Sequence, residues 1–292
     1  MNRIRLLSLL AILTIAASCS KSKFNENYVL SVPKANDVYV AGFDGNTTMI
    51  WKNGIASAIT DGSNYSSAYS VFVDDNDIYV AGYQNKNANA IASIWKNGIN
   101  TLLADSTDNS SANSVYVSNG DVYVAGFDNK GLNAAATIWK NGAETSLTDG
   151  ANDASANSVF VNGPDIYVAG YEVSVSNNVA KLWINGAATA LSDSSRYTYA
   201  QSVYVSGTDV YVAGIEFNGS KNVAKLWING EETNLTDGNN DAYAQSVYVS
   251  GTDVYVAVRN ITVQRMLLSF GRTALRLRLQ TAVKTLMRFL FM

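Results

Sequence analysis

Five tryptophans recur at a constant interval of 44 residues, and this interval restricts the possible folds more than any other feature of the chain. The positions are Trp51, Trp95, Trp139, Trp183 and Trp227. A second motif, Asp-(Val/Ile)-Tyr-Val-Ala, begins at residues 37, 77, 121, 165, 209 and 253, with a first spacing of 40 and then 44 throughout. Periods of this size are typical of solenoids, propellers and repeat arrays. The chain is therefore expected to build one structural unit several times.

The fifth repeat shows what each unit contains. Four short apolar or alternating runs occupy residues 202–205, 209–214, 224–228 and 231–236, and turn residues separate them. An Asn-Gly pair stands between the third and fourth runs at 229–230 and recurs at 53, 97, 141 and 185. Asn-Gly is a strong hairpin signal, because a type I′ turn needs positive φ at both central residues. Each repeat is therefore predicted to be a four-stranded antiparallel meander, and no stretch has the periodicity of a crossover helix.

A single meander cannot bury both of its faces, so neighbouring repeats must cover one another. Radial packing achieves this and leaves only short, protected edges. We therefore predict an all-β fold, a β-propeller of four-stranded antiparallel blades, about six in number with the last one disrupted, from an intact parent of about six or seven. Trp51 and Tyr39, with their equivalents in later repeats, are predicted to pack between blades. An open, linear β-solenoid is the alternative architecture.

The segment 70–83 reads Ser-Val-Phe-Val-Asp-Asp-Asn-Asp-Ile-Tyr-Val-Ala-Gly-Tyr. It resembles the first two strands of NHL-type and related bacterial β-propeller repeats. It lacks the double glycine of kelch repeats and the Gly-His and Trp-Asp marks of WD40 repeats. The resemblance covers residues 28–257 and implies the fold rather than an activity. Those families include binding scaffolds and some enzymes, and no catalytic motif is carried over to this chain.

The amino terminus has the pattern of a secretory signal. Arg3 and Arg5 precede an apolar run over residues 6–15, and small residues follow before Cys19. A basic region, a short apolar region and a small-residue cleavage site define such signals. The run is short for a permanent membrane span. Residues 1–18 are therefore predicted to be a signal peptide.

The segment Ala16-Ala-Ser-Cys19 resembles a bacterial lipobox, although alanine stands at residue 16 where leucine is commonest. The resemblance implies that Cys19 becomes the lipidated first residue and that residues 19–27 form a tether. Several acyl chains on one cysteine anchor stably, whereas a single chain binds marginally. Serine at residue 20, rather than aspartate, implies an outer-membrane lipoprotein of the cell envelope, facing either the periplasm or the outside. An ordinary signal peptide that contains a cysteine is the alternative.

The composition argues against several classes of function. The chain has no histidine, one cysteine, 21 basic and 24 acidic residues. Absence of histidine removes the usual general base near neutral pH and the commonest metal ligand, and a single cysteine excludes an intrachain disulfide. Nine basic residues lie in 1–18 and 258–292, which leaves 12 basic against 24 acidic residues in 19–257. This acidic body disfavours nucleic acid as a partner.

The repeat stops within its second strand, and Val258 stands where earlier repeats have glycine. Residues 258–292 are basic and follow no repeat pattern. In a shifted reading frame, with permitted codons, residues 259–273 can read Glu-Tyr-Asn-Gly-Thr-Lys-Asn-Val-Ala-Lys-Leu-Trp-Lys-Asn-Gly, which matches the in-frame segment 216–227. We therefore predict propeller repeats over 28–257 and a frameshifted, non-native tail over 258–292. A basic amphipathic helix at a membrane is the alternative, although its arginines and leucines do not separate into two faces.

The connections between strands differ in a regular way. In an up-and-down blade, the loops after the first and third strands lie on one face, and those after the second and fourth lie on the other. The first group is short and uniform, whereas the second is long and varies between repeats. Binding residues concentrate on loops held by a rigid scaffold, so we predict that the long-loop face binds the partner. Its candidate residues are Phe43, Asp44, Tyr83, Asn85, Phe127, Asp128, Tyr171, Glu172, Glu216 and Phe217.

Four aspartates in the longer loops are candidate oxygen ligands for Ca²⁺: Asp149, Asp153, Asp237 and Asp241. Their spacing is not that of a known calcium loop. An aspartate in such a position more often caps a turn by accepting backbone N–H groups. We favour the turn interpretation, also for the aspartates that open the Asp-(Val/Ile)-Tyr-Val-Ala motif, and predict no cofactor.

The leading hypothesis is a non-catalytic lipoprotein of the cell envelope whose propeller binds a glycan, a peptide or another envelope protein. It rests on a rigid repeat scaffold, Tyr- and Asn-rich loops, a lipid anchor and the lack of a catalytic constellation. A hydrolase or lyase of polysaccharide, using carboxylates and a bound metal, is the first alternative. The truncated product of a decaying gene is the second, motivated by the tail.

Overall fold

The computed structural model describes residues 37–105, 107–129, 131–175 and 177–260, together with the backbone strands 267–270 and 275–279. All regular elements in these residues are β-strands, which form six sheets that we number in chain order. The predicted signal peptide, Cys19 and the tether lie outside the described residues. No described segment forms a helix with the length and hydrophobicity needed to cross a bilayer.

The strands follow one another along the chain with short connections. Sheets 1 to 3 comprise β1 (Tyr39–Asp44), β2 (Thr47–Lys52), β3 (Ile55–Ala58); β4 (Ser66–Asp74), β5 (Asp77–Lys86), β6 (Asn89–Lys96), β7 (Ile99–Leu102); and β8 (Ser110–Ser118), β9 (Asp121–Asn129), β10 (Ala134–Lys140), β11 (Ala143–Ser146). Sheets 4 to 6 comprise β12 (Ala154–Asn162), β13 (Asp165–Ser174), β14 (Asn177–Ile184), β15 (Ala187–Ala190); β16 (Tyr197–Ser206), β17 (Asp209–Phe217), β18 (Asn222–Ile228), β19 (Glu231–Asn234); and β20 (Ala242–Ser250), β21 (Asp253–Asn260), β22 (Leu267–Phe270), β23 (Leu275–Leu279).

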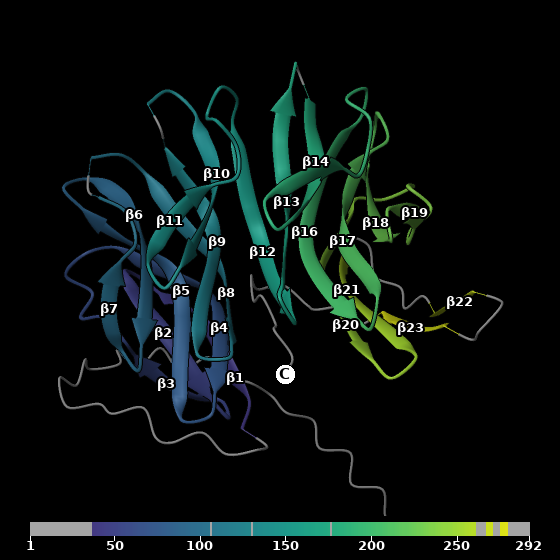
Figure 1. The fold of residues 1–292 in the computed structure, drawn as a ribbon. Helices are drawn as coiled ribbons and strands as arrows, with labels where there is room; N and C mark the ends of the chain where they lie inside the picture. Colours follow the sequence, from purple (N-terminus) through teal and green to yellow (C-terminus); the bar gives the residue numbers. More distant parts are fainter. Residues whose placement is uncertain are drawn as a thin grey trace, which may run out of the picture.

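Sheets 2 to 5 are antiparallel meanders in which four consecutive strands pair in chain order. The Asn-Gly pair joins the third strand to the fourth, and Asn97 and Gly98 have φ values of 52° and 85°, as a type I′ turn requires. Figure 1 shows the sheets following one another in chain order, from purple to yellow. The fold is an all-β propeller, as predicted, and its middle sheets are the expected four-stranded antiparallel blades.

The apolar core lies between consecutive sheets. The cluster between sheets 1 and 2 joins Tyr39 and Ile50 to Val80 and Trp95. One tryptophan occupies the same place at each of the next three interfaces, and the four indoles are fully buried: Trp95, Trp139, Trp183 and Trp227. Such large side chains dominate the energetics of a core, and the predicted packing between blades is confirmed for them. Trp51 is only partly buried, because no described sheet precedes sheet 1.

A glycine in the second strand of sheets 2 to 5 makes room for a bulge in the first strand. The register between β8 and β9 shifts between Ala112 and Ser114, which brings the carbonyl of Ser111 against Gly126. A Cβ at Gly126 would lie 1.8 Å from Ser111 O. Equivalent approaches of 1.9 to 2.0 Å occur at Gly82, Gly170 and Gly214. The Val-Ala-Gly segment of the repeat therefore needs glycine for space, not for its backbone angles.

Hydrogen bonds between sheets hold the first strands of neighbouring sheets together. The hydroxyl of Ser70 on β4 accepts a bond from Val115 N on β8 at 3.2 Å. The same pairing, one repeat further each time, joins Ser114 to Val159, Ser158 to Val203 and Ser202 to Val247. Each of these serine–valine hydrogen bonds links one sheet to the next, in addition to the apolar contacts between the sheets.

Sheets 1 and 6 depart from the four-stranded pattern. Sheet 1 has three described strands. In sheet 6, β23 pairs parallel to β21, whereas the third strand of sheets 2 to 5 runs antiparallel to the second. Val258 pairs with Ala244 at the bulge where Gly214 pairs with Ala200 in sheet 5. Among the described residues, sheet 6 does not pack on sheet 1 as consecutive sheets pack on each other. The regular repeat ends within β21.

Candidate binding face

One hydrogen-bonded unit, which we call the Asn-Asp clasp, holds the face with the short turns. In sheet 2, the Asn97 side chain accepts a bond from Ile78 N at 2.9 Å and donates one to Asp77 Oδ1 at 2.7 Å. Asn97 N also donates to Ile78 O at 2.9 Å. Since Asp77 begins the second strand and Asn97 follows the third, the clasp ties both short turns of the sheet together. The equivalent asparagines are Asn53, Asn141, Asn185 and Asn229.

A lysine completes the clasp in sheets 1 to 3. In sheet 2, Lys96 Nζ lies 2.7 Å from Asp77 Oδ2 and 5.2 Å from the centroid of the Tyr79 ring. The hydrogen bond from Lys96 holds the pKa of Asp77 below its ordinary value, and the same bond raises the pKa of Lys96. The aspartates of the repeat motif are thus engaged in turn structure on this face.

The loops after the second and fourth strands meet on the opposite face, the long-loop face. Between sheets 2 and 3, Asn89 Nδ2 donates to Thr107 O at 2.9 Å. The loop after each fourth strand opens with a turn capped by aspartate, as where Asp61 Oδ1 accepts from Ser63 N at 2.9 Å. The cap recurs at Asp105, Asp149, Asp193 and Asp237. The scaffold of these loops is therefore constant while the side chains on them vary.

Two predicted binding residues, Phe43 and Tyr83, lie in one aromatic cluster with Tyr65 and Tyr69. The ring centroids are 6.4 Å apart for Phe43 and Tyr65, and 5.9 Å apart for Tyr65 and Tyr83. Tyr69 lies 5.8 Å from Tyr83. Burial of its ring raises the pKa of Tyr83, whereas Phe43 and Tyr65 are 45% and 36% exposed. This cluster presents two aromatic rings to solvent.

A second aromatic cluster lies on sheets 4 and 5. Tyr171, also a predicted binding residue, packs against Tyr199 with centroids 4.6 Å apart. Tyr197 packs against Tyr199 at 5.0 Å, and their hydroxyls are hydrogen-bonded to each other. Burial raises the pKa of both Tyr171 and Tyr199. Of the predicted binding residues, Phe43 and Tyr83 thus lie in one aromatic cluster and Tyr171 lies in another.

The glutamates among the predicted residues are engaged in ion pairs. Glu172 Oε2 lies 3.1 Å from Lys181 Nζ. Glu216 Oε2 lies 3.1 Å from Lys225 Nζ and 2.8 Å from Arg196 Nη1. Glu216 is buried, and a buried carboxylate needs a paired cation. Both glutamates are thus already paired with cations of the chain itself.

The remaining predicted residues are dispersed. Asp44 and Phe217 are exposed, Asn85 and Phe127 are half-buried, and Asp128 is buried. Neither Phe127 nor Phe217 belongs to the two aromatic clusters described above. These five positions are not brought together into one site.

The four candidate calcium ligands accept hydrogen bonds from the chain. Asp149 caps its turn through Ala151 N, and Asp153 accepts from Ala134 N, each at 2.9 Å. Asp237 caps its turn through Asn239. Asp241 accepts from Asn222 N at 2.9 Å and pairs with Lys221 at 3.2 Å. Within the described residues, no three acidic, histidine or cysteine side chains gather as a metal site would require.

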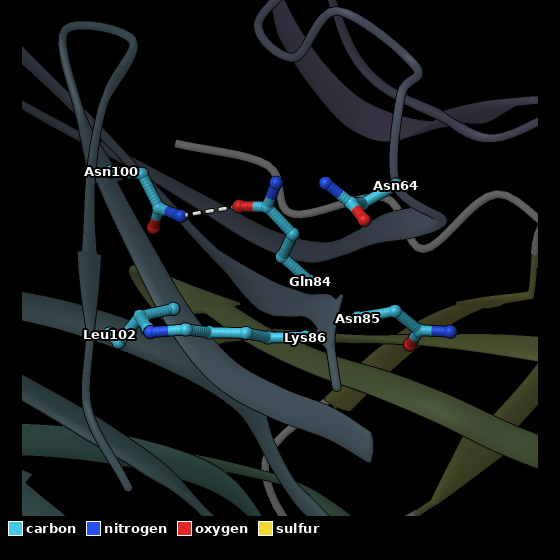
Figure 2. Close-up of a pocket in the computed structure, with 6 residues that line it drawn as sticks. All are labelled: Asn64, Gln84, Asn85, Lys86, Asn100 and Leu102. Carbon is cyan, nitrogen blue, oxygen red and sulfur yellow. Dashed lines mark hydrogen bonds between the residues drawn. The ribbon is translucent and has the colours of Figure 1, made fainter. Parts of the chain in front are cut away.

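A cleft of about 270 Å³ opens on the long-loop face where sheet 2 meets the loop after β3. Figure 2 shows Asn64 and Asn100 on either side of Gln84, with Lys86 extended beneath them. Asn100 Nδ2 donates to Gln84 Oε1 at 2.6 Å. The sequence-based prediction named Asn85 of this lining and missed Asn64, Gln84 and Asn100. Alignment of the repeats could have indicated the missed residues, because their equivalents three repeats later are charged: Arg196, Glu216 and Glu232.

Comparisons with known proteins give a likeness at the level of solved structures. No family model matches the chain, and no curated protein matches it. The β-propeller domain of the Trilobed protease from Pyrococcus furiosus, described as having an open velcro topology, is 13% identical, with a TM-score of 0.45 over 72% of this chain and 70% of that one. A protein described as TolB from Agrobacterium tumefaciens is 11% identical, with a TM-score of 0.42 over 68% of this chain and 81% of that one.

Proposed function

We propose that this chain is a non-catalytic binding module of the bacterial cell envelope, anchored through Cys19, which presents its long-loop face to a glycan, peptide or protein partner. The observation that carries the proposal is the contrast between its two faces. The short-turn face carries the Asn-Asp clasps and exposed aliphatic residues such as Ile55. The long-loop face instead exposes the aromatic rings of Phe43 and Tyr65 beside an amide-lined cleft. Aromatic rings and convergent polar groups on a rigid scaffold are typical of recognition sites.

A binding screen tests the proposal. The full chain, immobilised through a carboxy-terminal tag, is exposed to envelope glycans and envelope proteins of a bacterium. We expect saturable binding of at least one class, weakened when exposed long-loop residues such as Phe43 are replaced by alanine. Replacing Ile55 on the short-turn side, which is 71% exposed, serves as the matched control and should leave binding unchanged. Binding that depends on Ile55 and not on the long loops would contradict the proposal.

A specific observation also supports the truncated-product alternative. Val258 occupies the bulge position that requires glycine in sheets 2 to 5, and β23 pairs parallel to β21 where the repeat has an antiparallel strand. Val258 is the first residue of the predicted frameshifted tail, residues 258–292, and β23 lies within that tail. The nucleotide sequence decides this point, because the shifted frame must encode the repeat motif through the next Asn-Gly pair. Absence of that motif would refute the frameshift.

A further inference from the structure

The repeats place the same four positions at each groove between sheets on the long-loop face. One position is in the loop after the fourth strand of one sheet, and the other three are on the second, third and fourth strands of the next sheet. Between sheets 4 and 5 they are Arg196, Glu216, Lys225 and Glu232. Between sheets 1 and 2 they are Asn64, Gln84, Ser93 and Asn100. The two grooves are therefore equivalent in backbone and different in chemistry.

In the groove between sheets 4 and 5, the chain fills the site with its own charges. Arg196 Nη1 lies 2.8 Å from Glu216 Oε2 and 3.1 Å from Glu232 Oε1. Lys225 is only 3% exposed and contacts the same two carboxylates at 3.1 and 3.5 Å. Paired, buried charges of this kind leave few hydrogen-bonding groups for a ligand.

In the groove between sheets 1 and 2, which we call the first groove, all four positions are neutral. Ser93 is short and donates its hydroxyl to Ile91 O at 2.9 Å, so this position has no counterpart of Lys225. The exposed Lys86 of β5 also lines the cleft. Asn100 donates a hydrogen bond to Gln84 Oε1. This bond uses neither the amide N–H groups of Gln84 nor the amide oxygen of Asn100, so each side chain keeps a further hydrogen-bonding group. The cleft of about 270 Å³ lies here, and Figure 2 shows the three amides around it.

Aromatic surface adjoins the same groove. Phe43 lies on the face of β1 that carries Tyr39 and packs on sheet 2, because alternate residues of a strand share a face. Gln84 lies on the face of β5 that carries Val80 and packs on sheet 1. Phe43 and Gln84 therefore face the first groove from opposite sides, and Tyr65, which contacts Phe43, directly follows Asn64 in the chain.

We propose that the first groove binds a neutral saccharide unit. Amide side chains both donate and accept hydrogen bonds, as the hydroxyls of a sugar do, and exposed aromatic rings can cover the C–H face of a sugar ring. The four positions themselves carry no charge, and Lys86 in the lining can donate hydrogen bonds to sugar hydroxyls. The acidic body of the chain repels polyanions. This inference rests on the function proposed above and names the chemical class of its partner.

The test exchanges the chemistry of one groove for that of the other. The full chain is measured against immobilised neutral hexose oligosaccharides, the corresponding uronic-acid oligosaccharides and unrelated peptides. The exchange variant Asn64→Arg, Gln84→Glu, Ser93→Lys, Asn100→Glu rebuilds in the first groove the network that the chain already accommodates between sheets 4 and 5. We expect it to lose at least tenfold in affinity for neutral oligosaccharides. A second variant, Tyr65→Ala, removes an exposed ring and should weaken binding in the same direction if the exchange variant fails to fold.

Asn152→Ala is the matched control, because Asn152 occupies the position of Asn64 two repeats later, and it should leave affinity unchanged. Neutral saccharide binding that survives both the exchange and Tyr65→Ala overturns the inference, as does recognition of uronic acids or peptides alone. If the chain recognises only uronic acids or peptides, and this binding depends on other long loops, the proposed function is retained and the neutral-saccharide inference is refuted. If nothing binds the long-loop face, the proposed function and the inference are both refuted.

Discussion

At the scale of single residues, the glycine of each Val-Ala-Gly segment links the sequence repeat to backbone packing. Its missing Cβ admits the carbonyl of the bulged first strand, at a separation that no side chain permits. Sheet 1 provides an internal contrast. A Cβ at Gly42 would meet only the Trp51 ring, at 3.2 Å. A side chain at this motif position would therefore clash with backbone in sheet 3 but would meet only a side chain in sheet 1.

Gly126→Ala should therefore destabilise the chain by about 2 kcal/mol or more, the cost of forcing extra volume into a packed site. Gly42→Ala is the matched control and should cost less than about 1 kcal/mol, since a small shift of Trp51 relieves the contact. Urea unfolding of the two variants gives both values. Equal losses would show that the bulge is not the reason for the glycine.

At the scale of elements, the Asn-Asp clasp joins the two short turns in sheets 2 to 5. Its charged part predicts a dependence on pH. Lys96 holds the pKa of Asp77 below its ordinary value near 3.8, and Lys140 does the same for Asp121. A carboxyl with a lowered pKa in the folded state contributes stability at neutral pH, and that contribution disappears as the pH falls below 4 through the folded pKa.

We expect the urea midpoint to fall between pH 7 and pH 3, and to fall less in the double variant Asp77→Asn, Asp121→Asn. Asparagine keeps a hydrogen-bond acceptor for the clasp and removes the group that titrates. Asp74→Asn, outside the clasp, is the control, and its urea midpoint should fall between pH 7 and pH 3 by as much as that of the parent. An identical fall in parent and double variant would show that other carboxyls govern the acid response.

Much of this architecture can be predicted from particular residues. The Asn-Gly pair predicts its hairpin because its φ requirements are local, and Trp95 predicts a buried interface because its spacing repeats. The first groove could not be predicted in the same way. Asn64, Gln84 and Asn100 lie in three separate elements, and each is an ordinary polar residue in its own segment. The packing of sheet 1 against sheet 2 brings them together. Their lack of charge becomes significant when they are compared with the charged equivalents between sheets 4 and 5, such as Arg196.

At the scale of the whole molecule, the chain is an array whose regularity ends at sheet 6. Each Ser–Val bond needs a following sheet, and the series ends with Ser202 and Val247. In sheet 6, β23 pairs with β21 at Tyr255 and Val256, in parallel orientation. Apolar packing between sheets is the main stabilising term in such arrays, so the last sheet should be the weakest.

Restoring the shifted reading after residue 257 should complete sheet 6 and raise the unfolding temperature by more than about 5 °C, the shift that a gain of a few kcal/mol gives in a domain of this size. Replacing residues 258–292 by a scrambled sequence of the same composition is the control and should give no increase. Calorimetry compares the three proteins. A restored chain that melts with the parent would contradict the account of the tail.

Partner binding at the first groove of the long-loop face can be followed by amide hydrogen exchange. The full chain is compared with and without a neutral oligosaccharide that it binds. In the bound chain we expect slower exchange of the backbone amides in segments 61–66 and 83–86. The amides of the Asn-Gly turns on the opposite face should exchange at an unchanged rate. Slowed exchange at the Asn-Gly turns, with segments 61–66 and 83–86 unaffected, would contradict binding at the first groove.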